Sequence, residues 1–183
     1  MKYNEITKSY YDLVPWVNIN LKDYDDTICE STYKELTNMI DPNFLDQNIR
    51  ASALKNIHFQ EFDGNIMVLS IDSSTGNGSY RNLFQFPQFE EVVRDTSLKP
   101  IEAARLLIWV DDVKLHCTCP SFLYHGYEYL LTVLDSSIIP EDRKPRRNNP
   151  GERGICCKHL NRTLKAFPFY ATDIAKEIKR LRG

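Results

Sequence analysis

Four cysteines and two histidines form the two short clusters of this sequence whose residue types are best suited to chemistry. The first cluster is His116-Cys-Thr-Cys-Pro120 and the second is Cys156-Cys-Lys-His159. Structural zinc takes four thiolate or imidazole ligands in a tetrahedron, and three cysteines with one histidine satisfy that requirement. The clusters therefore predict one Zn²⁺ site of the Cys3His type. Four protein ligands leave no open position for water, so we expect the site to be structural rather than catalytic.

The spacing within each cluster limits which side chains can share an ion. On an extended strand, residues i and i+2 point the same way, so Cys117 and Cys119 would present two sulfurs from one face. On a formed helix, Cys157 and His159 point to different sides; they converge only if Cys157 precedes the helix and His159 lies in its first turn. Cys156 and His159, three residues apart, would converge on a fully formed helix. The residues alone leave Cys156 and Cys157 as alternatives.

The pattern Cys-x-Cys followed by Cys-x-His at a helix start resembles the SWIM zinc finger. The resemblance assigns the ligands to Cys117, Cys119, Cys157 and His159, and thus favours Cys157 over Cys156. Pro120 stands in its usual place after the second cysteine. The chain departs from the family in one respect, because 37 residues separate Cys119 from Cys157, more than in most members.

A longer stretch, from Pro100 to Lys179, is similar to a variant of this finger found in proteins of tailed bacteriophages. The similar parts are 103–107 (AARLL), 116–127 (HCTCPSFLYHGY), 157–162 (CKHLNR) and 173–178 (DIAKEI). The resemblance implies a non-enzymatic structural or protein-interaction protein of the virion, associated with its neck, tail or capsid. Its partners would be other protein subunits of the assembly. Its location would be the virion, or the cytoplasm if the chain is not from a phage.

A basic loop near the second cluster favours an alternative function, a nucleic-acid-binding zinc module. Basic side chains on this loop and on the helix from 157 would neutralise phosphates beside the zinc site. The competing interpretation is a solvated loop or a contact with an acidic protein. The candidate residues are Arg143, Lys144, Arg146, Arg147, Arg153, Lys158 and Arg162.

Charge divides the chain into an acidic and a basic part. Residues 1–112 hold 10 Lys and Arg against 18 Asp and Glu, whereas residues 113–183 hold 13 against 7. We therefore predict an acidic α+β part over 1–112 and a basic zinc-binding part over 113–183. The loop over 76–78 has the composition of a hairpin connection rather than a linker, which favours one fused unit.

Hydrophobic periodicity predicts an α+β fold: a small antiparallel sheet with packed helices, and a SWIM-like zinc module of hairpin plus helix in the C-terminal half. Strands are expected over 57–62, 65–71 and 80–86, with Asp63-Gly64 as a hairpin turn. A further hairpin is expected from 108–110 and 113–116, with His116 pointing opposite to Cys117. An aromatic arm over 1–29 is expected to dock on another surface. Helices are expected over 30–40, 45–55, 89–94, 100–107, 122–135 and 157–167, and a last one from an N-cap at Thr172.

Composition and missing motifs exclude several classes of protein. With 42% hydrophobic and 26% charged residues, the chain is not disordered by composition. Its longest apolar run, Leu106 to Val110, is far below the roughly 20 residues of a membrane span, and the N-terminus does not resemble a signal peptide. Five cysteines without an export signal argue against a disulfide framework. Without a phosphate loop, a nucleophile elbow or an HExxH motif, we expect no enzyme, no small-molecule substrate and no membrane partner.

Overall fold

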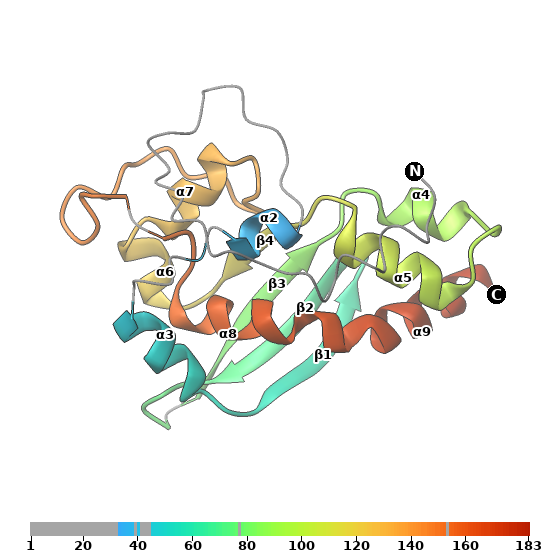
Figure 1. Ribbon diagram of the computed structural model, residues 1–183, viewed down its shortest axis with the longest axis horizontal. Coiled ribbons are helices and arrows are strands. Elements are labelled where there is room, and N and C mark those ends of the chain that lie inside the picture. The colour runs from blue at the N-terminus through green and yellow to red at the C-terminus, as the bar shows by residue number, and fades with distance from the viewer. Residues whose placement is uncertain (1–32, 39, 41–44, 77, 153) are drawn as a thin grey trace.

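The computed structural model describes residues 33–38, 40, 45–76, 78–152 and 154–183. Within these ranges the protein has an α+β fold built on a four-stranded antiparallel sheet of order β1-β2-β3-β4 (Figure 1). The strands are β1 (Ile57–Asp63), β2 (Ile66–Asp72), β3 (Ser79–Gln85) and β4 (Lys114–Cys117). No helix in the described ranges is long and apolar enough to cross a membrane.

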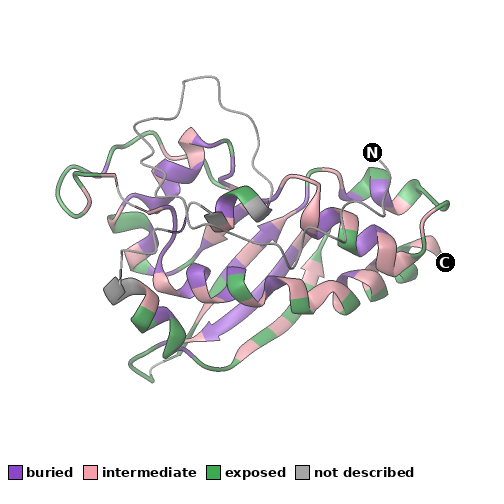
Figure 2. Cartoon of the chain, viewed as in Figure 1, coloured by how far each residue is buried: buried purple, intermediate pink, exposed green. Residues whose placement is uncertain are grey.

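α8, the 3-10 helix η3 and α9 run end to end across one face of this sheet (Figure 1). α5 packs against α9, and α3 packs against α8. Figure 2 shows that β2 is buried along its length between the outer strand β1 and β3. The helices are α2 (Tyr33–Asn38), α3 (Leu45–Ser52), α4 (Phe89–Arg94), α5 (Pro100–Trp109), α6 (Pro120–Tyr124), α7 (Tyr127–Val133), α8 (Lys158–Ala166), η3 (Phe167–Tyr170) and α9 (Ala171–Arg182).

A stack of three phenylalanines fixes the C-terminal end of α8 to the sheet. The ring of Phe167 lies 4.6 Å from that of Phe84 and 5.8 Å from that of Phe86, in near-parallel orientation. All three side chains are fully buried. Aromatic pairs at such separations contribute about 0.5–1.5 kcal/mol beyond the area that they bury. The stack therefore sets how α8 lies over β3.

The described core contains residues from both the acidic part over 1–112 and the basic part over 113–183. One cluster of buried side chains includes Leu69 and Phe84 of the sheet together with Leu130, Leu160 and Ile174 from the later helices. β4, which follows residue 112, pairs with β3, which precedes it. The division into parts at 112 and 113 itself stays a prediction.

The expected hairpin over 108–116 is wrong. α5 continues to Trp109, because Ala104, Leu107 and Ile108 face the core at helical spacing. β4 instead pairs antiparallel with β3, from Gln85↔Lys114 to Asn82↔Cys117. A short apolar run such as 106–110 fits either a strand or a buried helix, and here the core selects the helix.

The single helix expected over 122–135 is also wrong, because α6 ends at Tyr124 and α7 starts at Tyr127. Gly126 lies between them in the left-handed region, with φ +70. Pro145 packs so closely on Gly126 that any side chain at this position would clash with the proline ring. Leu123 consequently leaves the apolar face and is 43% exposed. The apolar spacing continues through the break, so periodicity did not indicate it.

The remaining elements follow the sequence more closely. The three expected strands and the helices over 45–55, 89–94 and 157–167 are confirmed to within a few residues, while the helix expected over 30–40 is described only as α2. The first turn is shifted by one residue, because Asp63 pairs with Ile66. Thr172 is not an N-cap, since α9 starts directly after η3. The arm over 1–29 lies outside the described residues.

Asp111 is a half-buried acid in an unfavourable place. It directly follows α5, and its backbone N–H donates to the carbonyl of Leu106. The carbonyl end of a helix repels negative charge. Burial, with the charges of Asp112 and Glu91, raises the pKa of Asp111 to about 6. Its Oδ2 is buried and has no hydrogen-bond partner among the described residues.

We predict that Asp111→Asn raises the free energy of unfolding at pH 7.5 by about 1 kcal/mol. A shift of about two pK units corresponds to ~3 kcal/mol, and solvent screens much of it because the carboxyl is partly exposed. A carboxyl whose pKa is raised by folding destabilises the protein above that pKa, and the cost disappears as the pH falls from about 6 towards 4. Urea titrations at pH 7.5 and pH 5 should therefore show a smaller difference at pH 5. An equal difference at both values would contradict this account.

Candidate metal centre

Three sulfurs and one imidazole meet beneath the start of α8. Cys117 ends β4, Cys119 is the N-cap of α6, Cys157 is the N-cap of α8, and His159 lies in the first turn of α8. One ligand atom from each lies within 4.8 Å of the other three, and all four residues are buried. Zinc–sulfur bonds of about 2.3 Å in a tetrahedron place sulfurs about 3.8 Å apart. The group is thus consistent with one bound zinc ion and suggests a metal ion at its centre.

β3 and β4 position the first two sulfurs. The ladder continues one residue beyond β4, because Thr118 N donates to Arg81 O and Arg81 N donates to Thr118 Oγ1, both at 3.0 Å. Cys119 remains extended at φ −76 and ψ 144, and Pro120 then begins α6. Cys117 and Cys119 therefore reach the group from one side of an extended segment, as their spacing predicted.

The N-terminus of α8 positions the other two ligands. Cys157 is extended at φ −72 and ψ 168, and its Sγ accepts a hydrogen bond of 3.4 Å from Leu160 N. The positive end of a helix favours a thiolate in this place. Because Cys157 precedes the helix, His159 can converge with it, which is the condition that the spacing required.

Cys156 is not one of the four ligands that the structure brings together. Its side chain is buried in the core, and burial raises the pKa of its thiol to about 12. The alternative pair of Cys156 and His159 required a helix that already included Cys156. The helix begins after Cys157, so the structure groups His159 with Cys157 and not with Cys156.

The protein shifts the pKa values of the three cysteines of this group in different directions. Burial raises the pKa of Cys117 and of Cys157 well above the usual range. The pKa of Cys119 is lowered, because its thiolate accepts hydrogen bonds, first from Cys117 and then from Cys157. The protein alone thus stabilises one thiolate, and three would need a cation among them.

His159 provides an independent test of whether a metal ion fits. Both ring nitrogens are buried without a hydrogen-bond partner among the described residues, and the ring packs against Tyr80 at 4.6 Å. An unsatisfied buried acceptor costs about 1–3 kcal/mol. A metal ion would supply the missing partner for one nitrogen.

Two features beside the group were not predicted from the sequence. His116 points away from Cys117, as expected, but its Nδ1 lies 2.9 Å from Oε1 of Glu128, a buried carboxylate on α7. Asn82 is fully buried on β3, in register with Cys117. Asn82 could have been noticed in the sequence, because it is a polar residue on the side of the predicted strand that also carries Tyr80 and Phe84. No local pattern indicates the pairing of His116 with Glu128.

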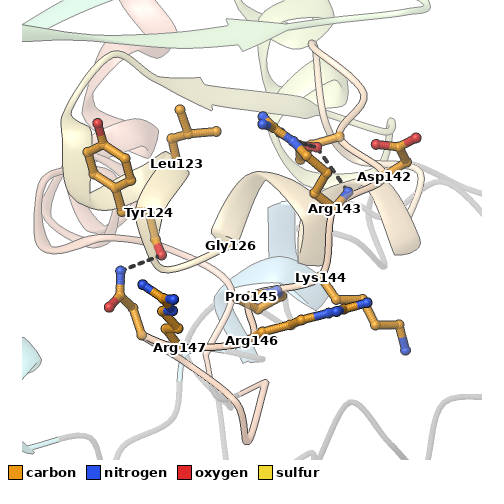
Figure 3. A pocket seen from close by; sticks show the side chains of 11 residues that line it. Leu123, Tyr124, Gly126, Asp142, Arg143, Lys144, Pro145, Arg146 and Arg147 are labelled. Carbon is orange, nitrogen blue, oxygen red and sulfur yellow. Dashed lines mark hydrogen bonds and ion pairs between the residues drawn. The ribbon is translucent and has the colours of Figure 1, made fainter.

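The candidate nucleic-acid residues divide into two groups. Four of them, Arg143, Lys144, Arg146 and Arg147, line an open pocket of about 850 Å³ that also includes Tyr124 (Figure 3). The other two described residues bind within the fold, because Lys158 Nζ donates to Ser74 Oγ and Arg162 Nε donates to Leu54 O. Arg153 lies outside the described residues.

Within the pocket the four cations differ in what they contact. Arg143 pairs with Glu141, and Lys144 Nζ lies 3.9 Å from Glu152 Oε1. Arg146 and Arg147 are exposed, and neither forms an ion pair with another described residue.

We compared the chain with protein-family models, with curated proteins and with solved structures, and none of the three comparisons gives a match.

Proposed function

We propose that Cys117, Cys119, Cys157 and His159 bind one Zn²⁺ ion, and that the ion stabilises a non-enzymatic structural protein. The observation that carries this proposal is the convergence of four buried ligand atoms within 4.8 Å of one another. Four protein ligands complete a zinc tetrahedron and leave no position for water or substrate. The part of the chain that such an ion would secure is the junction of β4 and α6 with α8.

The same site would close a long insertion. Residues 120–156 contain α6, α7 and a loop whose described residues form no further helix or named strand, and the ligands lie at both ends of this segment. Zinc binding at structural sites provides on the order of 10 kcal/mol or more of folding free energy. An ion at this point would hold the ends of the insertion together.

We further propose that the protein contacts other proteins through the pocket beside α6, as a component of a tailed-phage virion. Support for the assembly comes from the resemblance over Pro100–Lys179. Support for the surface comes from two exposed guanidiniums, Arg146 and Arg147, beside the exposed side chains of Leu123 and Tyr124. Arginine and tyrosine are enriched at protein interfaces, and guanidiniums pair with carboxylates. A partner with acidic and apolar side chains fits this surface.

The loop that carries the two arginines is held in place. Pro145 packs on Gly126, Asn148 Nδ2 donates to Tyr124 O at 3.0 Å, and Glu141 N donates to Thr132 Oγ1 at 2.9 Å. Three anchors on α6, α7 and their connection restrain the backbone of the loop. Binding there would cost less ordering entropy than binding by a flexible loop.

The choice of ligands is tested by two neighbouring substitutions. We expect wild-type protein to bind one equivalent of zinc. Cys157→Ser should weaken zinc binding by at least ~100-fold, because a hydroxyl replaces a thiolate ligand. Cys156→Ser should retain one equivalent, although burial of a hydroxyl lowers the free energy of unfolding by about 1–2 kcal/mol. Metal content by mass spectrometry and affinity by chelator competition give both results.

Protein that binds no zinc in any form would refute the proposed site. Retention of zinc by Cys157→Ser with its loss in Cys156→Ser would mean that the third sulfur is Cys156. Addition of a strong chelator should lower the thermal midpoint of wild type and leave Cys157→Ser almost unchanged, because only a folded state that binds the ion is stabilised by it.

The alternative function, nucleic-acid binding, is tested by a charge reversal in the loop. We predict that wild type shows no binding to duplex DNA at 150 mM salt, whereas the alternative requires affinity that falls steeply with salt. Arg146→Glu with Arg147→Glu should leave zinc content unchanged, because both side chains are exposed and separate from the ligands. DNA binding that the double variant abolishes, and that the surface control Arg94→Glu does not, would favour the alternative.

Placement in a virion is tested on purified particles. If the gene is present in a phage that can be propagated, we expect peptides of this chain to sediment with infectious particles in a density gradient. Their amount should be stoichiometric with a neck, tail or capsid protein when measured by quantitative mass spectrometry. Detection in the lysate alone, outside the particle fractions, would refute the virion assignment and leave the zinc site unaffected.

A further inference from the structure

Asn82 is a fully buried amide that has no hydrogen-bond partner within the described part of the chain. It lies in the middle of β3, and its exposed fraction is 0%. Neither its Nδ2 nor its Oδ1 forms a hydrogen bond with any described residue. Leaving a buried polar group unsatisfied costs about 1–3 kcal/mol, so this asparagine destabilises the fold in the absence of a partner.

The strand register places this amide beside the first sulfur. Asn82 pairs with Cys117 in the β3–β4 ladder. The next pair, Arg81 and Thr118, is joined by hydrogen bonds in both directions. Pairs alternate between bonded and non-bonded along an antiparallel ladder, so Asn82 and Cys117 form a non-bonded pair, the type with the closer side chains.

A second neighbour on the same strand shows which way this face points. Tyr80 lies two residues before Asn82 and therefore on the same side of β3. Its ring contacts the ring of His159 at 4.6 Å. The face of β3 that carries Asn82 is thus the face turned towards the metal-binding group, under the start of α8.

We propose that Asn82 is a positioning residue of the metal centre, and that its Nδ2 donates a hydrogen bond to the Cys117 thiolate when the ion is bound. The inference rests on the proposed zinc site. Metal binding removes the thiol proton and leaves an anionic sulfur that accepts a charge-assisted hydrogen bond. Such a bond orients the ligand and withdraws charge from it, as partners beyond the ligands do in other metal sites.

The proposal is tested with Asn82→Leu, whose side chain has the same number and branching of heavy atoms but no donor. Co²⁺ replaces Zn²⁺ as the probe, because its sulfur-to-metal charge-transfer band reports the electron density on the thiolates. We expect one equivalent of Co²⁺ in both proteins, a dissociation constant about 10–100-fold higher in the variant, and a charge-transfer band at longer wavelength. In the presence of chelator the variant should instead have the higher urea midpoint, since the unsatisfied amide is gone.

Two further variants separate this role from a general effect on folding. Asn161→Ala removes an amide of similar burial on α8 that donates to Asn48 Oδ1, so it should lower the urea midpoint and leave the charge-transfer band in place. Asn82→Ser keeps a donor and should shift the band less than Asn82→Leu. Wild-type affinity and an unshifted band in both Asn82 variants would overturn the inference, whereas absence of Co²⁺ and Zn²⁺ binding by wild type would overturn the site itself.

Discussion

Negative charge on buried sulfur is the constraint on which this structure depends. Cys117, Cys119 and Cys157 bring three ionisable thiols together where little water can reach, and only Cys119 has its pKa lowered by its neighbours. Desolvation of each further thiolate costs several kcal/mol unless an opposite charge is present. A divalent cation removes that cost and also satisfies His159, whose buried ring nitrogens have no other described partner. Electrostatics and hydrogen bonding thus both favour a metal ion at this point.

The position of α8 follows from attachments at its two ends. At its start, the ligands would join it to β4 and α6. At its end, Phe167 is stacked on Phe84 of β3 and on Phe86, which directly follows β3. With an ion bound, α8 would be held at both ends, and His159 and Cys157 would keep a single orientation towards the group. This arrangement also explains how the fold tolerates a long segment over 120–156, because loop length costs little entropy once the ends are fixed.

The grouping of four metal-ligating side chain types and the α+β fold were predictable from sequence because both depend on local spacing. Cys-x-Cys on a strand and Cys-x-His at a helix start each need only a few residues to be recognised, and a helix boundary decided between Cys156 and Cys157. The break at Gly126 depends on the packing of Pro145, and the end of α5 depends on packing in the core. Both involve residues distant in the sequence, so the periodicity of apolar residues does not indicate them. The pairing of His116 with Glu128 joins two elements and leaves no local signal.

Part of the positive charge of residues 113–183 is used inside the fold. The Arg182 guanidinium donates to the carbonyls of Val92, Val93, Asp95 and Leu98, at and beyond the C-terminal end of α4. Lys158 and Arg162 bind groups on the β2–β3 connection and at the end of α3. These three cations therefore join the basic part of the chain to the acidic part. Arg146 and Arg147 differ from them, because their charge faces solvent from a restrained loop, and a contact with an acidic partner would begin there.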